Sequence, residues 1–95
     1  MPNEHTETFS SVWDAIADTP EQAANFRTRA ELMQQIVAII KASDWKQAEA
    51  ACSLRVTQSR INDLLRGRVS RFSLDALVNI ATALGWRVHV ELAAA

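Results

Sequence analysis

The chain has 95 residues, of which 48% are hydrophobic and 22% charged, with a formal net charge of −1. One Cys and two His exclude a disulfide framework and a conventional zinc site, and the short apolar runs exclude a membrane span, so we expect no metal, no cofactor and no membrane partner. Only two Gly and two Pro in a chain rich in Ala favour a single, mostly helical domain.

The first 18 residues predict a tail followed by a short arm. Residues 1–8 are polar and acidic, so they predict a disordered tail; they do not resemble a signal peptide, and we therefore expect a cytoplasmic protein. Residues 9–18 predict a brief helix with Phe9, Trp13 and Ile16 on one side. These side chains either pack on the chain's own helices, which is the interpretation we favour, or form an arm that binds a partner.

A long helix is predicted from Pro20 to about Ala42. Thr19 is a suitable N-cap, Pro20 fits the first helical position, and Gln22 stands at the capping-box position. Asp44 tolerates the left-handed backbone that a sharp stop needs, so we expect it to end this helix. Apolar residues recur at helical spacing and predict burial on more than one side: Phe26, Ala30, Leu32, Met33, Ile36, Val37, Ile39 and Ile40.

Two short helices joined by a tight turn are predicted next. The first spans Lys46 to Cys52, and the second spans Gln58 to Arg66, with Thr57 as its N-cap and Gly67 as its stop. A small residue stands where these helices would cross, and apolar residues stand where the second would be pinned to a core: Ala51, Leu54, Val56, Ile61 and Leu64. This is the layout of a helix-turn-helix, whose second helix enters the DNA major groove.

Positive charge is concentrated on this motif, although the whole chain is slightly acidic. Residues 1–45 hold seven acidic and three basic residues (−4), residues 46–71 hold six basic and two acidic (+4), and residues 72–95 hold one basic and two acidic (−1). A surface that neutralises DNA phosphates needs such local charge. The alternative interpretation is a solvated helix face with ordinary surface arginines.

The predicted DNA contacts fall into two groups. Gln58 and Asn62 suit bidentate contacts to adenine, and Arg60 suits guanine or phosphate. Basic residues that flank the second helix are expected to hold the DNA backbone. The full predicted interface is Lys46, Gln47, Thr57, Gln58, Ser59, Arg60, Asn62, Arg66, Arg68 and Arg71.

The end of the chain predicts a helix followed by a strand. Ser73 is the expected N-cap of the helix, and Gly85 is its expected stop. Apolar and polar residues then alternate, which predicts a half-buried strand whose apolar side consists of Trp86, Val88, Val90 and Leu92. Because this strand has no mate within the chain, we expect it to pair with the same strand of a second copy about a two-fold axis, or with a partner protein.

These segments resemble a known family. Residues 27–85 resemble the Xre-type (phage-repressor and Cro-like) helix-turn-helix domain, in which a Gln opening the first motif helix braces a Gln of the recognition helix; Gln47 and Gln58 match these positions. Residues 9–92 resemble HigA-type antitoxins and related small regulators, through SVWDAIA, RAELMQQI, QAEAA, LLRG, RFSLDALVNIATALG and RVHVEL. The sequence departs from the family at Arg55, where Gly is usual, and at Lys46, where Thr or Ser usually caps the helix; Asp44 is the substitute cap we expect.

We therefore predict a mostly α, five-helix, lambda-repressor-like helix-turn-helix domain with a C-terminal β-strand used in dimerisation. The expected parts are a tail at residues 1–8, the DNA-binding domain at residues 9–85, and the dimerisation strand at residues 86–92.

The resemblance implies an autoregulating repressor and antitoxin. It would bind a palindromic double-stranded DNA operator as a homodimer, with recognition helices about 34–36 Å apart, and would neutralise a RelE/HigB-like ribonuclease toxin. The alternatives are a stand-alone regulator with no toxin partner, and a protein-interaction module that no longer reads DNA. No nucleophile, acid and base stand at plausible spacing, so we expect no enzyme.

Overall fold

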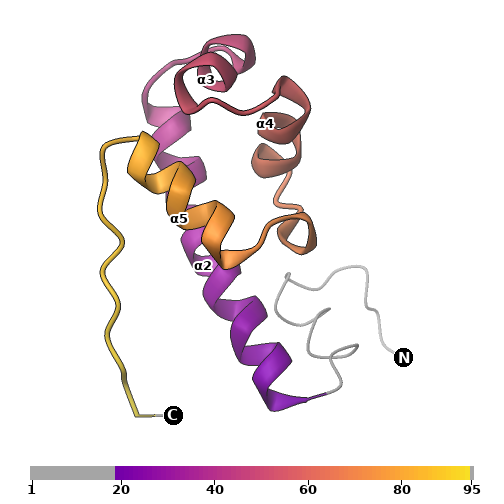
Figure 1. The fold of residues 1–95 in the computed structure, drawn as a ribbon, viewed down its shortest axis with the longest axis vertical. Helices are drawn as coiled ribbons and strands as arrows, with labels where there is room; N and C mark the ends of the chain where they lie inside the picture. Colours follow the sequence, from indigo (N-terminus) through magenta and orange to yellow (C-terminus); the bar gives the residue numbers. More distant parts are fainter. Residues whose placement is uncertain (1–18, 95) are drawn as a thin grey trace.

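The computed structural model describes residues 19–94 of the chain, and in this range all regular structure is helical (Figure 1). The elements are α2 (Pro20–Ala42), α3 (Gln47–Leu54), α4 (Gln58–Leu65), the short 3-10 helix η2 (Val69–Arg71) and α5 (Leu74–Ala83). The long helix α2 packs against α4, η2 and α5, and α3 packs against α4 and α5. The predicted tail at residues 1–8 and the predicted arm at residues 9–18 lie outside the described residues.

Local signals determine where the long helix begins and ends, as predicted. The Thr19 hydroxyl accepts a hydrogen bond from the backbone N–H of Gln22 at 3.1 Å, and Pro20 occupies the first helical position, where its missing N–H costs nothing. The helix ends at Ala42, and Asp44 takes a left-handed backbone with φ of 62°. Its buried side recurs every three or four residues: Phe26, Ala30, Met33, Ile36 and Ile40.

Side chains from all four α-helices and from the connection before α5 meet in one core. The largest fully buried ones are Met33, Ile36, Ile61, Leu64, Phe72 and Leu77. Ile61 and Leu64 come from the inner side of α4, so packing against the core fixes the rotation of that helix. The predicted pins of the second motif helix are thus confirmed, with Val56 only half-buried.

Arg29 of α2 ties the connection between α4 and α5 to the rest of the molecule. Its Nη1 atom donates hydrogen bonds to the main-chain oxygens of Phe72 at 3.0 Å and Val69 at 3.3 Å, and its Nε atom donates to Oδ1 of Asn25 at 2.7 Å. One guanidinium therefore adds a second donor to the Val69 carbonyl, which also accepts from the Phe72 N–H, and donates to the Phe72 carbonyl directly after η2, in a partly buried place.

Replacing Arg29 by Ala is expected to lower the free energy of unfolding by about 1.5–3 kcal/mol, because two carbonyls lose a charged donor. Chemical denaturation followed by circular dichroism measures the loss. The matched control is Gln35→Ala, which truncates an exposed side chain of the same helix and should change stability little. Equal stability of the two variants would show that Arg29 is not a structural tie.

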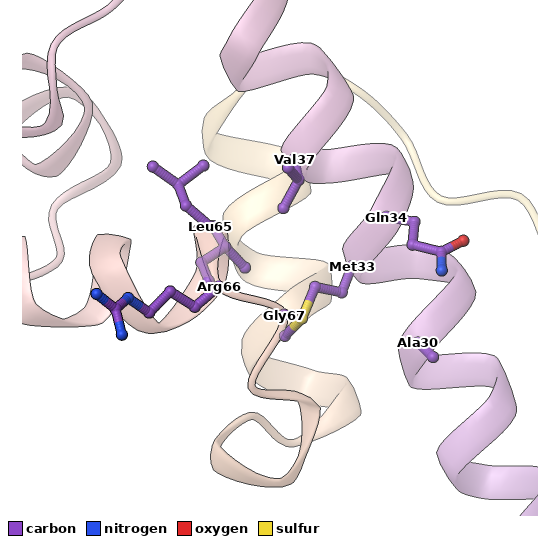
Figure 2. A pocket seen from close by; sticks show the side chains of 8 residues that line it. Ala30, Met33, Gln34, Val37, Leu65, Arg66 and Gly67 are labelled. Carbon is purple, nitrogen blue, oxygen red and sulfur yellow. The ribbon is translucent and has the colours of Figure 1, made fainter. Parts of the chain in front are cut away.

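A shallow, mainly apolar groove of about 200 Å³ runs between α2 and the end of α4 (Figure 2). Met33 and Val37 of α2 form one wall, and Leu64 and Leu65 of α4 form the other. The chain leaves α4 at this point through Gly67, whose φ of 73° is the left-handed backbone expected of the residue that stops a helix. The predicted stop at Gly67 is therefore confirmed.

The last helix also follows its prediction. The Ser73 hydroxyl accepts a hydrogen bond from the backbone N–H of Ala76 at 3.0 Å and so caps α5, and Gly85, with φ of 88°, follows its end.

The predicted C-terminal β-strand and the five-helix count are wrong. Residues 86–94 run as an extended segment away from the end of α5 without pairing with any described part of the chain (Figure 1). Only Val88 packs against the core, whereas Trp86, Val90 and Leu92 are 59%, 79% and 101% exposed. Alternation specifies two sides of a segment, but a strand exists only through hydrogen bonds to a second strand, and residues 19–94 supply none. Four α-helices and one 3-10 helix lie in that range, and the expected fifth α-helix falls on residues 9–18.

Candidate nucleic-acid interface

A left-handed residue makes the turn between α3 and α4. Arg55 has φ of 58° and ψ of 41°, and its side chain is exposed. The N–H groups that follow α3 close the turn, with Val56 N donating to the oxygen of Ala51 at 3.0 Å and Arg55 N to the oxygen of Cys52 at 3.3 Å. The turn is therefore kept without the usual Gly, as predicted, although a side chain here costs about 1–2 kcal/mol.

Replacing Arg55 by Gly is expected to raise the free energy of unfolding by about 0.5–1 kcal/mol. Glycine adopts the left-handed backbone without the steric cost that Arg55 has. Part of this gain in stability is lost, because glycine has more conformational entropy in the unfolded chain. Thermal denaturation compares this variant with Arg55→Ala, which removes the same charge and keeps the penalty. If the Ala variant gains as much as the Gly variant, charge repulsion and not the backbone explains the change.

Helix α4 exposes its amino-terminal turn. The Thr57 hydroxyl accepts a hydrogen bond from the backbone N–H of Arg60 at 3.1 Å, which confirms the predicted N-cap. Thr57, Gln58 and Ser59 are exposed, and Asn62, one turn further on, is half-buried. Because the opposite side of the helix is packed in the core, these four polar residues form the outward surface of α4.

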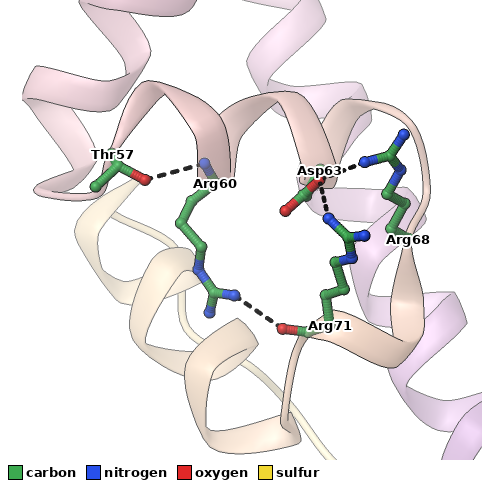
Figure 3. A network of polar contacts seen from close by, with 5 residues as sticks. All are labelled: Thr57, Arg60, Asp63, Arg68 and Arg71. Carbon is green, nitrogen blue, oxygen red and sulfur yellow. Dashed lines mark hydrogen bonds and ion pairs between the residues drawn. The ribbon is translucent and has the colours of Figure 1, made fainter.

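Arg60 lies against its own chain and not on that outward surface (Figure 3). Its Nη1 atom donates a 2.8 Å hydrogen bond to the main-chain oxygen of Arg71, and its guanidinium carbon lies 4.2 Å from the centre of the Phe72 ring. A contact with guanine would have to release the hydrogen bond and the cation–π contact, which together contribute about 1–2.5 kcal/mol. The structure thus separates Arg60 from Gln58 and Ser59, with which the sequence had grouped it.

Asp63 brings together two of the predicted phosphate contacts, and the sequence analysis missed it. Its Oδ1 atom accepts hydrogen bonds from Nη1 of Arg68 at 2.8 Å and from Nη1 of Arg71 at 3.0 Å (Figure 3). Asp63 is only 7% exposed, the one buried charged residue in the described part of the chain. The available signal was composition: Asp63 is one of only two acids among the six bases of residues 46–71, so a pairing with those bases was to be expected.

The arginines also set the ionisation of Asp63. Burial raises the pKa of its carboxyl, but hydrogen bonds from Arg68 and Arg71, together with their charges, lower it more, so the pKa lies below the ordinary value of 3.8. A depressed pKa stabilises the fold in full above that ordinary value, and the contribution is lost as the pH falls through the folded-state pKa.

The stability difference between the wild type and Asp63→Asn is therefore expected to shrink on acidification. It should be constant at pH values well above the ordinary pKa of 3.8 and should fall as the pH drops below that value, because the native carboxylate takes up its proton only there. Urea denaturation at a series of pH values measures this difference. A difference that does not change with pH would mean that the ion pairs contribute nothing to stability.

The remaining predicted contacts lie near the two ends of the motif helices. Lys46 is the exposed N-cap of α3, and Glu49, not the expected Asp44, supports it: the Lys46 backbone N–H donates to Oε1 of Glu49 at 2.8 Å. Gln47 is exposed at the start of α3, and within the described residues no hydrogen bond joins it to Gln58. Arg66 is exposed as the C-cap of α4.

Among residues 19–94, no three His, Cys, Asp or Glu side chains gather as a metal site would require. Within the same range, no helix has the length and apolar character needed to cross a bilayer.

Comparison with known proteins places the chain in a family. A family model described as a helix-turn-helix domain matches residues 15–93. No curated protein and no solved structure matches the chain.

Proposed function

This chain belongs to the helix-turn-helix domain family, and from that premise we propose that it is a sequence-specific transcriptional repressor. A helix-turn-helix domain indicates DNA binding, with the second helix of the motif in the major groove. Helix α4 is that second helix, and its packing onto the core through Ile61 and Leu64 supports this role, because a recognition helix must be held rigidly.

The observation that carries the proposal is the outward surface of α4. Exposed side chains that both donate and accept hydrogen bonds occupy its first turn, and exposed cations stand beside its two ends, at Arg55 and Arg66. Amide and hydroxyl groups are the uncharged side chains that read base edges, while Lys and Arg hold phosphates. Arg60, which lies against η2, supports the helix and is not among the base contacts we propose.

We further propose that two copies bind a palindromic operator. Helix α4 has eight residues, about 12 Å, and so reaches only a few base pairs. Specific affinity usually needs two such helices in successive major grooves, about 34–36 Å apart. Trp86, Val90 and Leu92 are the exposed apolar residues that we propose for side-chain contact with the second copy.

Within this class, we propose that the chain is an antitoxin that represses its own operon. The motif series over residues 9–92 supports this narrower role through its resemblance to HigA-type antitoxins. The partner would be a RelE/HigB-like ribonuclease toxin. Co-expression with the product of the adjacent gene tests it: the two should co-purify, and growth arrest by the neighbour alone should be relieved. A harmless neighbour that does not bind leaves a stand-alone repressor.

Selection of bound sequences from a random DNA pool, followed by a gel shift at several salt concentrations, tests the DNA-binding proposal. The expected result is an enriched palindrome with half-sites about 10 base pairs apart, and a logarithmic affinity that falls linearly with the logarithm of salt concentration. An unenriched pool together with no gel shift at low salt would leave the chain as a protein-interaction module.

A further inference from the structure

The recognition helix carries a buried acid in a region whose charge is otherwise almost all basic. Residues 46–71 hold only two acidic residues against six basic ones. Glu49 has a local explanation, because it accepts the hydrogen bond from the Lys46 backbone at the start of α3. Asp63 has no such local role, and a negative charge beside a DNA-binding surface opposes phosphate binding.

The carboxylate of Asp63 holds two guanidinium groups close together. Both Nη1 atoms donate to the same Oδ1 atom, so they lie no farther apart than two hydrogen-bond lengths. The side chains of Arg68 and Arg71 remain 38% and 57% exposed, whereas that of Asp63 is 10% exposed. Each arginine has five N–H donors and uses one on Asp63, so the others remain for a ligand. The three side chains together therefore carry a net charge of +1, and both guanidinium groups remain partly exposed to solvent.

The backbone that carries these arginines is held from two sides. Arg29 of α2 binds the carbonyls of Val69 and Phe72, and Arg60 of α4 binds the carbonyl of Arg71. Figure 3 shows Arg60 reaching from α4 to the Arg71 carbonyl, and Arg68 and Arg71 converging on Asp63. Backbone and side chains are therefore ordered together before any ligand arrives, which removes the cost of ordering them on binding.

We propose that Asp63 is a positioning residue for the DNA backbone: it presents Arg68 and Arg71 as a preset pair to a phosphate beside the groove entered by α4. This inference rests on the proposed function. A planar guanidinium matches phosphate oxygens through two parallel N–H bonds, and a fixed pair can share one phosphate or hold neighbouring ones. The buried acid thus increases affinity for an anionic ligand, although its own charge has the opposite sign.

A role in folding alone does not explain the cluster as well. The ion pairs supply the pH-dependent part of the stability described above, but water screens their half-exposed cations, so this contribution is small. The positioning role and a simple effect of net charge also predict opposite changes in DNA affinity when Asp63 is replaced. Removing the acid makes the protein more positive by one unit, so electrostatics alone predicts tighter DNA binding. Loss of the preset pair predicts weaker binding.

The experiment measures DNA affinity of the whole chain against salt concentration, using the selected palindrome and a random duplex. Asp63→Asn is compared with Glu49→Gln, which makes the same charge change in the same region, keeps the oxygen that accepts from Lys46, and has no arginine partner. We expect Asp63→Asn to weaken binding about tenfold on both duplexes and to reduce the salt slope by about one. Glu49→Gln should bind as well as the wild type or more tightly.

A charge-conserving variant covers the case in which Asp63→Asn does not fold. Arg68→Lys with Arg71→Lys keeps both positive charges but removes the planar donors, and it should also weaken binding several-fold at unchanged net charge. Tighter or equal binding by a folded Asp63→Asn variant, or by the double Lys variant, overturns the inference while the proposed function stands. If the wild type binds neither duplex, the proposed function itself fails.

Discussion

Replacing Phe72 by Ala is expected to lower the free energy of unfolding by about 3–5 kcal/mol. The ring is 1% exposed in the core, so its removal leaves a cavity that the surrounding side chains cannot close. It also removes the surface on which the Arg60 guanidinium rests. Domains of this size have a total stability of about 5–15 kcal/mol, so the variant should unfold at a temperature at least about 10 °C lower than the wild type.

Thermal unfolding monitored by circular dichroism measures this effect, with Phe72→Leu as the control. Leucine keeps most of the apolar volume and loses the aromatic ring, so it should cost much less stability than Ala. A similar loss in the two variants would show that the contact between the ring and Arg60, and not the filling of the core, is what Phe72 contributes.

Replacing Gln58 and Asn62 together by Ala is expected to weaken binding to the selected operator at least about 30-fold, or roughly 2 kcal/mol, since each bidentate base contact contributes about 1–3 kcal/mol. Binding to random DNA should change little, because phosphate contacts do not depend on these amides. Gel shifts on the two duplexes measure the ratio. The double variant Gln35→Ala with Asn79→Ala, which removes two exposed amides from α2 and α5, is the control.

The result on random DNA separates the possible failures of this prediction. Equal weakening on both duplexes would mean that the amides contact the backbone or support the helix. Unchanged binding to the operator would mean that α4 is not the reading helix. Arg60→Ala provides a further contrast, because its side chain lies against Phe72 and the Arg71 carbonyl, so its loss should act mainly through stability.

The residues that one helix buries could be predicted from the sequence, whereas contacts between different segments could not. The motif pins Ile61 and Leu64 follow from spacing alone, because a helix repeats every 3.6 residues and its inner side must be apolar. The assignment of Arg60 to the outward surface failed to anticipate the structure, because a long side chain can bend back. Its partners, the Phe72 ring and the Arg71 carbonyl, come from a connection whose path the sequence does not specify.

Asp63 shows that the particular partners of a charged residue, like contacts between segments, could not be predicted from the sequence. A count of residues 46–71 treats every acid and base alike and finds a surplus of four positive charges. Within residues 19–94, the structure divides these charges into cations without a carboxylate partner, such as Arg55 and Arg66, and the two that share Asp63. The surplus indicated a surface for phosphates, but only the packing of η2 beside α4 shows how two of its arginines are oriented.

By itself, the sequence determined which sides the helices bury and where they start and stop to within two residues; the largest difference is α3, which ends at Leu54 and not at the predicted Cys52. Helices α2, α4 and α5 begin at the N-caps Thr19, Thr57 and Ser73. The left-handed residues Asp44, Gly67 and Gly85 follow the ends of these three helices. Both effects act within a few residues of the chain. Only the tertiary structure decided that residues 86–94 are unpaired, because a strand needs a second strand to exist. It also decided how the arginines between α4 and η2 are held, because those contacts join residues five to eleven positions apart across a change of chain direction.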